Sequence, residues 1–311
     1  MAKKTSIGGQ AVMEGIMMRG PKEIAVAVRK PDGEIEIDKK PISSIFTKYK
    51  WLKFPIIRGC IGFFESMIIG VKALMYSAEF VDIEGEEDEP QGKIDMWLEK
   101  TFGDKLKDYV IYFSVVLSLA LGVGLFMILP GFLADLLRLS EIDKNIRSIV
   151  ELVIRLSIFL TYMLLVSRMK DIQRVFMYHG AEHKTIACYE KGDELTVDNV
   201  RVHSRLHPRC GTNFLLIVML VSVFVFMLIP STSTWIGRVG YRLLLLPIVA
   251  GVAYEIIKLV GRYDNICTRI VSKPGMWLQY LTTKDPDDRQ IEVAIEALKA
   301  VIPENTQEDV W

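Results

Sequence analysis

Four long runs of apolar residues stand out along the chain, from Tyr109 to Leu129, Ile149 to Val166, Phe214 to Ile229 and Tyr241 to Leu259. Each is close to the ~20 residues that an α-helix needs to cross ~30 Å of hydrocarbon. The pattern therefore predicts four membrane-spanning helices.

A fifth apolar run, from Phe54 to Tyr76, differs because charged residues interrupt it regularly. Arg58, Glu65 and Lys72 recur every seven residues and place a narrow polar stripe along a helix. Such a stripe favours an interfacial or re-entrant helix over a fifth span.

The distribution of basic residues predicts the orientation, since short cytosolic loops collect Lys and Arg. With four spans, the loop from Arg168 to Arg209 and both termini face the cytosol. The N-terminal region is basic through Lys39, Lys40, Lys48, Lys50 and Lys53. We therefore expect a multi-pass protein of the inner (cytoplasmic) membrane. The polar start of the chain lacks the apolar core of a cleaved secretory signal.

The remaining segments read as structure outside the membrane. Two β-prone stretches, Glu23 to Lys30 and Glu34 to Asp38, flank a Pro-Asp-Gly turn and predict a small β-hairpin. The acidic run from Glu84 to Glu89 is typical of a flexible linker. Near the end, a capping segment that begins at Asp285 predicts an amphipathic helix to about Val301. The expected fold is mainly α, a polytopic membrane helical bundle with a small N-terminal β-hairpin.

These elements divide the chain into six consecutive parts. They are a cytosolic N-terminal segment with the hairpin (1–53), an interfacial helix with the acidic linker and an amphipathic helix (54–108), a transmembrane hairpin (109–167), a cytosolic His/Cys segment (168–212), a second transmembrane hairpin (213–260) and a cytosolic tail with an amphipathic helix (261–311).

The composition limits the classes of partner that we expect. Half of the 311 residues are hydrophobic, yet 38 basic and 38 acidic residues cancel, so no net field favours nucleic acid. The expected partners are the lipid bilayer and an unidentified substrate, with a second copy of the chain in a homo-oligomer as a further candidate. Four scattered cysteines are too few for a disulfide framework and indicate thiols in a reducing compartment.

All four histidines lie between His179 and His207, which is the main sign of chemistry in the chain. Imidazole nitrogens suit borderline divalent metals. Zinc is the metal that we expect. On a helix predicted from Met169 to about Lys191, His179 and His183 are four residues apart and share a face. Glu182 can join them as a ligand or as a base that activates water. The order His-x-x-Glu-His matches the inverted zincin motif in spacing only.

A further ligand has to come from the motif His207-Pro-Arg-Cys210, with His207 as the first choice and Cys210 as a thiolate alternative. Four protein ligands would make a closed structural zinc site, whereas three would leave a position for water. The sequence leaves both open. His203 is expected to be a polar interface residue and Cys188 a packed thiol.

Two further groups of polar residues are candidates for function. The glycine-rich segment from Gly8 to Gly20 either presents Gln10, Glu14 and Arg19 to a site or is an ordinary lead into the hairpin. Within the spans, charge is costly. Arg155 is expected to pair with Glu151 on its own helix, and Glu255 to pair with Lys258 or to act as a further ligand. So few buried charges make transport through the bundle a weak alternative.

Four motifs carry a resemblance to a known family. They are Gly9-Gln-Ala-Val-Met-Glu-Gly15, Tyr178-His-Gly-Ala-Glu-His-Lys184, Leu206-His-Pro-Arg-Cys-Gly211 and Leu281-Thr-Thr-Lys-Asp-Pro-Asp287. With them the chain resembles the YqhQ-like bacterial membrane proteins, a domain of unknown function described as a predicted metal-dependent enzyme. The resemblance implies a metal-site role for His179, Glu182, His183, His207, Cys210 and Glu14, and it leaves out His203.

The leading hypothesis is a metal-dependent hydrolase with a cytosol-facing zinc site. In it His179, His183 and His207 hold the ion, with Cys210 as the fourth candidate. Glu182 is the catalytic base, and Glu14, Arg19 and Arg209 assist it; either arginine would steady a developing anion. The alternative is a membrane scaffold or assembly factor with a structural zinc site.

Overall fold

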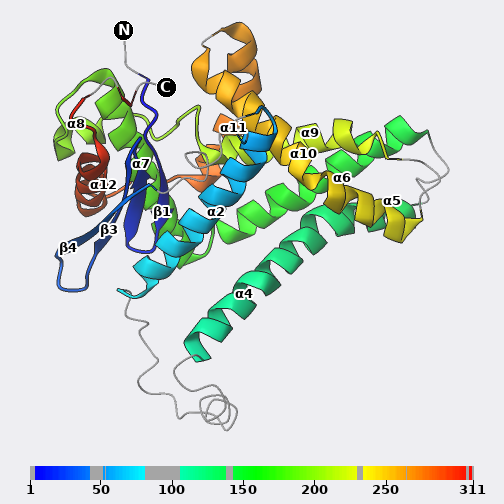
Figure 1. Cartoon of the computed structure of the whole chain (residues 1–311), viewed down its shortest axis with the longest axis horizontal. Helices are drawn as coiled ribbons and strands as arrows, with labels where there is room; N and C mark the ends of the chain where they lie inside the picture. Colours follow the sequence, from blue (N-terminus) through cyan, green and yellow to red (C-terminus); the bar gives the residue numbers. More distant parts are fainter. Residues whose placement is uncertain are drawn as a thin grey trace. The chain divides into compact units, whose positions relative to one another are not determined.

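The computed structural model describes residues 4–42, 52, 54–80, 106–137, 143–229, 234–263, 265–305 and 308–309, and they form two compact units (Figure 1). The first contains residues 1–81, 161–225 and 244–311; the second contains residues 82–160 and 226–243. The predicted acidic linker, Glu84 to Glu89, lies outside the described residues.

The N-terminal part of the first unit is a four-stranded antiparallel sheet in the order β1-β2-β3-β4. Its strands are Gly8–Val12, Gly15–Arg19, Glu23–Arg29 and Ile35–Pro41. The predicted hairpin is confirmed as β3 and β4, with Gly33 at a φ of 91° in the turn between them. The glycine-rich segment before it, for which two interpretations were open, forms the other two strands.

Two helices cover one face of this sheet. Helix α7, Lys170–Lys191, ends at Gly192 in the left-handed conformation, as the sequence predicts. Helix α12, Asp288–Val301, confirms the predicted amphipathic helix, but its capping box is formed by Asp287 and Gln290, so the capping carboxylate is Asp287 and not the expected Asp285. The shared core contains Ile16, Met18, Ala25 and Ala27 from the strands, Tyr178, Ala181 and Ile186 from α7, and Val293, Ala294, Ala297, Leu298 and Val301 from α12. A short helix, α8 (Val197–Arg201), packs beside them.

Helix α2, Ile57–Ala78, packs on the opposite face, against Val12, Met17, Val26 and Val28. Successive residues of a strand point to opposite faces, and both faces of β2 and β3 are apolar, so the sheet has to be covered twice. The sheet is therefore the middle of three layers.

Most of the remaining chain is apolar helix. These elements are α4 (Leu106–Val123), the π-helix η3 (Gly124–Ile128), α5 (Leu129–Leu136), α6 (Lys144–Val166), α9 (Gly211–Phe226), α10 (Trp235–Arg262) and α11 (Ile266–Thr282). Among the described residues, four helical stretches are long and apolar enough to cross a membrane: Ile57–Ala78, Phe113–Leu136, Ile146–Val166 and Ile236–Arg262.

This set differs from the predicted spans at two places. The third predicted span forms α9, which has only 16 residues; it covers about 24 Å at 1.5 Å per residue. Helix α2, expected at the interface, satisfies the length and composition of a span. Two of the three residues of its polar stripe form ion pairs within the protein: Arg58 binds Glu255 of α10, and Glu65 binds Arg19 of β2.

Charged residues of the second unit form a buried group. Glu151 on α6 accepts hydrogen bonds from Arg147, one turn away, and from Arg242 of α10. The Arg155 guanidinium lies over the Phe226 ring, with 5.6 Å to the centroid. Glu151, expected to pair with Arg155 alone, is therefore part of a wider network of ion pairs. Glu255, expected beside Lys258, forms an ion pair with Arg58.

Candidate metal centre

Helix α7 carries the centre of the site, and Gly180 lets it approach its neighbour closely. A Cβ atom at Gly180 would lie 1.9 Å from the Lys284 carbonyl oxygen. The Lys284 N–H donates to the Phe176 carbonyl over 2.8 Å, which joins the segment after α11 to α7. The glycine within the His-Gly-Ala-Glu-His motif therefore has a packing role, and it brings the backbone of residues 282–284 beside the histidines.

Backbone carbonyls fix the orientation of both α7 histidines. His179 Nδ1 lies 2.8 Å from the Thr282 carbonyl oxygen, and His183 Nδ1 lies 2.6 Å from that of Arg205. A carbonyl oxygen only accepts, so each Nδ1 carries a proton, and in the neutral imidazole this leaves the lone pair on Nε2. This is the arrangement by which proteins orient histidine ligands toward a metal.

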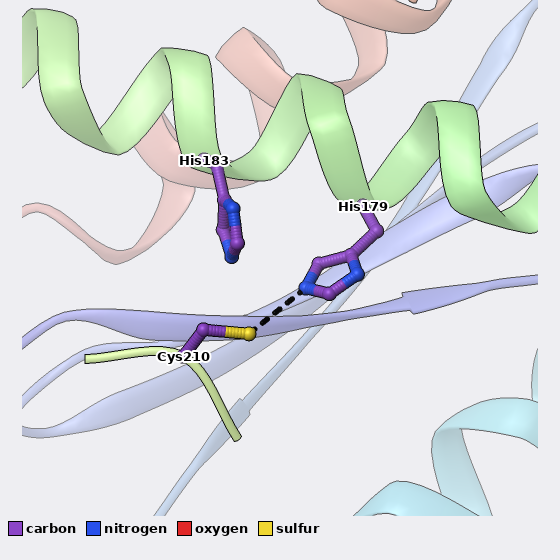
Figure 2. A group of neighbouring side chains, drawn as sticks. All are labelled: His179, His183 and Cys210. Carbon is purple, nitrogen blue, oxygen red and sulfur yellow. Dashed lines mark hydrogen bonds between the residues drawn. The ribbon is translucent and has the colours of Figure 1, made fainter. Parts of the chain in front are cut away.

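Cys210 faces the two imidazoles from the segment before α9 (Figure 2). Its Sγ lies 3.2 Å from His179 Nε2, and one donor atom from each of the three residues lies within 4.8 Å of the others. Cys210 is buried, and the Thr212 N–H approaches its sulfur at 3.4 Å. The structure thus brings together three of the four predicted ligands, His179, His183 and Cys210.

Glu182 is buried one residue before His183. Burial raises the pKa of its carboxyl group, while His179 and the Gly9 N–H lower it in part. Gly9 donates to Oε1 over 3.0 Å. A Cβ atom at Gly9 would lie 2.8 Å from the Met17 carbonyl oxygen and 3.0 Å from the Glu182 carboxyl carbon. Strand β1 can reach the carboxylate because this residue has no side chain.

These groups line a cavity of about 390 Å³ between β1, α7 and the segment 207–212. Its polar lining includes His179, Glu182, His183, His207, Arg209 and Cys210. The two nitrogen donors, the sulfur donor and the carboxylate therefore line the same cavity.

His207, the first choice for a third ligand, lies in the cavity but outside the close group. Its ring centroid is 5.5 Å from that of His183, and its Nε2 is 3.6 Å from Glu190 Oε2. Gln279 holds the His207 backbone through two hydrogen bonds of 2.8 Å. Burial, mainly, lowers the pKa of His207 to about 4. The ring is therefore neutral near pH 7 and already has a carboxylate neighbour.

Glu190 is a site residue that the sequence interpretation missed. Burial alone would raise the pKa of its carboxyl group, but the contacts from His207 and Arg209 outweigh burial and lower it. The Thr5 N–H also donates to Glu190, over 2.8 Å. A signal existed, since Glu190 follows His183 by seven residues and so returns to the same side of the helix two turns later.

The chain matches, over residues 54–304, a family described as "Protein of unknown function (DUF1385)". It belongs to this family. It is also 37% identical over 297 residues to the "Uncharacterized protein YqhQ" of Bacillus subtilis (strain 168), which covers 95% of this chain and 92% of that protein. No solved structure matches the chain. The predicted family is confirmed, and its description names no reaction.

The part shared with the family includes α7 and Cys210. Of the three other predicted catalytic residues, two lie away from the cavity and one lines it. Glu14 binds Arg174 and lies 3.3 Å from the Tyr178 hydroxyl; Arg19 binds Glu65 at 3.2 Å. Neither lines the cavity. Arg209 does line it, with its guanidinium hydrogen bonded to Glu190. From the glycine-rich segment, Gln10 does line the cavity, and the Gly9 backbone reaches the Glu182 carboxylate.

The chemistry of the donor set fits a borderline divalent ion. Two neutral imidazoles and one thiolate are ligands that zinc accepts, and three protein ligands leave a tetrahedral site one open position. His179, His183 and Cys210 would hold such an ion, with the Thr282 and Arg205 carbonyls holding the imidazoles in place.

Proposed function

We propose that this membrane protein binds a divalent ion, zinc by preference, through His179, His183 and Cys210 and acts as a metal-dependent hydrolase. One observation supports the proposal above the others. Both imidazoles are anchored through Nδ1 to backbone carbonyls, beside a buried thiol and a buried carboxylate that line the same cavity.

Glu182 is the proposed base. A bound divalent ion supplies a Lewis acid and lowers the pKa of water. A base works best when its own pKa lies near the working pH, and burial moves the pKa of Glu182 upward in that direction. The Gly9 N–H holds Oε1, which leaves the other carboxylate oxygen to accept a proton from water.

A scaffold with a structural zinc site is the second candidate. It would need a fourth protein ligand, and the nearest imidazole is His207. Glu190 and Arg209 already approach the His207 ring nitrogen, at 3.6 Å and 3.3 Å. These contacts favour a three-ligand centre with an open position, and therefore the enzyme.

The cavity adjoins the start of α9, an apolar helix that follows Cys210 directly. A substrate at the cytosolic face of the inner membrane would reach it, and an amide or a lipid-linked phosphoester both suit the chemistry. Arg209 is the cation in the cavity wall that would stabilise a developing anion. This placement rests on the topology expected from the basic loops, with both termini in the cytosol.

Metal analysis of the purified chain tests the proposal. We expect His183→Ala to lose the ion at this centre, because the variant lacks one of three ligands. Glu182→Gln should keep the metal and the fold but fail to complement a deletion strain. Glu296→Gln, on the exposed side of α12, is the matched control and should behave as wild type.

Two results would contradict the proposal that this protein is an enzyme. Undiminished metal content in His183→Ala would remove the metal centre. Full complementation by Glu182→Gln, with metal and fold retained, would leave the scaffold as the function.

A further inference from the structure

We infer that Cys188, Asp193 and His203 form a second metal site, distinct from the cavity. One donor atom from each of the three residues lies within 4.8 Å of the others. Thiolate, carboxylate and imidazole are together a ligand set that zinc accepts. This inference does not depend on the proposed hydrolase.

Local backbone geometry brings the three residues together. Cys188 lies in the last turn of α7, and Gly192 then ends the helix with a φ of 81°. This turn folds Asp193 back toward the helix, and its N–H donates to the Cys188 carbonyl over 3.2 Å. Helix α8 returns the chain, so that His203 arrives just beyond its end.

His203 has a buried nitrogen that the protein leaves without a good hydrogen bond. Its side chain is 4% exposed, and Nε2 lies 3.0 Å from Asp193 Oδ2. Despite that distance, Nε2 makes no hydrogen bond of acceptable geometry with any residue that the structure describes. A buried polar atom in this state is costly, and a metal ion beside the carboxylate would satisfy it.

The Cys188 thiol has only weak contacts to give up. Its sulfur lies 3.6 Å from the Glu194 carbonyl oxygen and 3.8 Å from that of Asp193. When the metal binds, the thiol loses its proton to solvent and the sulfur–metal bond replaces the S–H bond. The Asp193 side chain is half exposed. An ion would enter, and the thiol proton would leave, on this side of the site.

The site would brace the polypeptide that builds the cavity. Two residues beyond His203, the Arg205 carbonyl accepts the hydrogen bond that orients His183, and Cys210 follows on the same segment. Fixing His203 to the end of α7 therefore fixes the start of this segment. The packing of Cys188 with Val200, Ile291 and Ile295 makes a structural role fitting.

Metal stoichiometry separates the two sites. The full-length chain, purified in detergent, is stripped with a chelator, loaded with Zn²⁺ and measured for zinc per chain. We expect two ions for wild type and one each for His203→Ala, Asp193→Asn and His183→Ala. The control is Asp198→Asn, an exposed carboxylate on α8 that should retain two ions.

A wild type that binds one ion, which neither His203→Ala nor Asp193→Asn removes, would overturn the second site. If His203→Ala fails to fold, the zinc content of Asp193→Asn still tests the site, because this side chain is half exposed. A single ion lost in Asp193→Asn but kept in His183→Ala would support this site and refute the hydrolase centre. The two proposals therefore fail separately.

Discussion

At the scale of single residues, the proposed metal centre depends on Cys210. It is the proposed sulfur donor, and its Sγ lies 3.2 Å from His179 Nε2. Serine is nearly the same size but is a poor ligand for zinc. We expect Cys210→Ser to weaken zinc binding at the cavity by more than tenfold, about 1.4 kcal/mol or more at 25 °C, as measured by competition with a zinc chelator.

Cys267→Ser is the matched control, because this cysteine is exposed and outside both donor groups. Equal zinc affinity in the two serine variants would remove Cys210 from the ligand set. It would also return His207 to consideration, since its ring is the next imidazole in the cavity.

The residues of the candidate site show which features a sequence can predict. His179, Glu182 and His183 were predicted to act together because spacing on one helix is a local property. The roles of Glu14, Arg19 and His207 depended on partners far along the chain. Arg174 lies 160 residues from Glu14, and Gln279 lies 72 residues from His207. No periodicity in one sequence predicts such pairings.

At the scale of elements, the contact of α7 with the segment 282–286 sets the position of the histidines. Gly180→Ala would place a Cβ atom 1.9 Å from the Lys284 carbonyl oxygen, so the helix and the segment must separate. We expect a loss of about 1–3 kcal/mol of stability, the usual cost of overpacking. Zinc binding should weaken as well, because the Thr282 carbonyl that orients His179 would move.

Thermal unfolding and zinc competition measure both effects. Gly122→Ala on α4 is the control, since a Cβ atom there meets nothing within 4 Å, and alanine favours a helix over glycine. A Gly180→Ala protein as stable and as zinc-competent as wild type would show that the close approach is not needed.

Elements with strong local signals were predicted well. Helix α7 has its glycine stop and α12 its capping carboxylate, and both were expected within a few residues of their observed ends. For strands β1 and β2 the sequence supports two interpretations, because glycine is depleted in strands. Their pairing is fixed by contact with neighbours: Met17 faces the α2 side of the sheet and Met18 the α7 side.

At the scale of the whole molecule, the number of spans depends on α2, if α9, with 16 residues, still crosses as the predicted third span. By length and composition the helix could cross a membrane. Its C-terminal half, however, lies against the sheet. Glu65 pairs with Arg19 at 3.2 Å, Gly70 contacts the Gln10 side chain, and Ser77 Oγ accepts from the Met13 N–H over 3.2 Å.

These contacts leave eight residues, 57 to 64, before the part of α2 that the sheet covers. Eight residues of helix extend about 12 Å, well short of ~30 Å of hydrocarbon. We therefore predict that α2 enters the membrane surface without crossing it, so that both of its ends face the cytosol. The histidine loop and the N-terminal sheet then stay on one side, as the basic residues require.

Labelling of intact cells with a membrane-impermeant maleimide tests this topology in a background without Cys60 and Cys267. Phe54→Cys and Glu79→Cys, exposed before and after α2, should both resist labelling until the cells are opened. Thr234→Cys, exposed in the short segment before α10, should label from outside and serves as the positive control. Labelling of only one of the two α2 positions in intact cells would make α2 a span. Each added span inverts every segment that follows it. Because the sheet, which precedes α2, packs on α7, which follows it, a spanning α2 would also require a different number of crossings between the two.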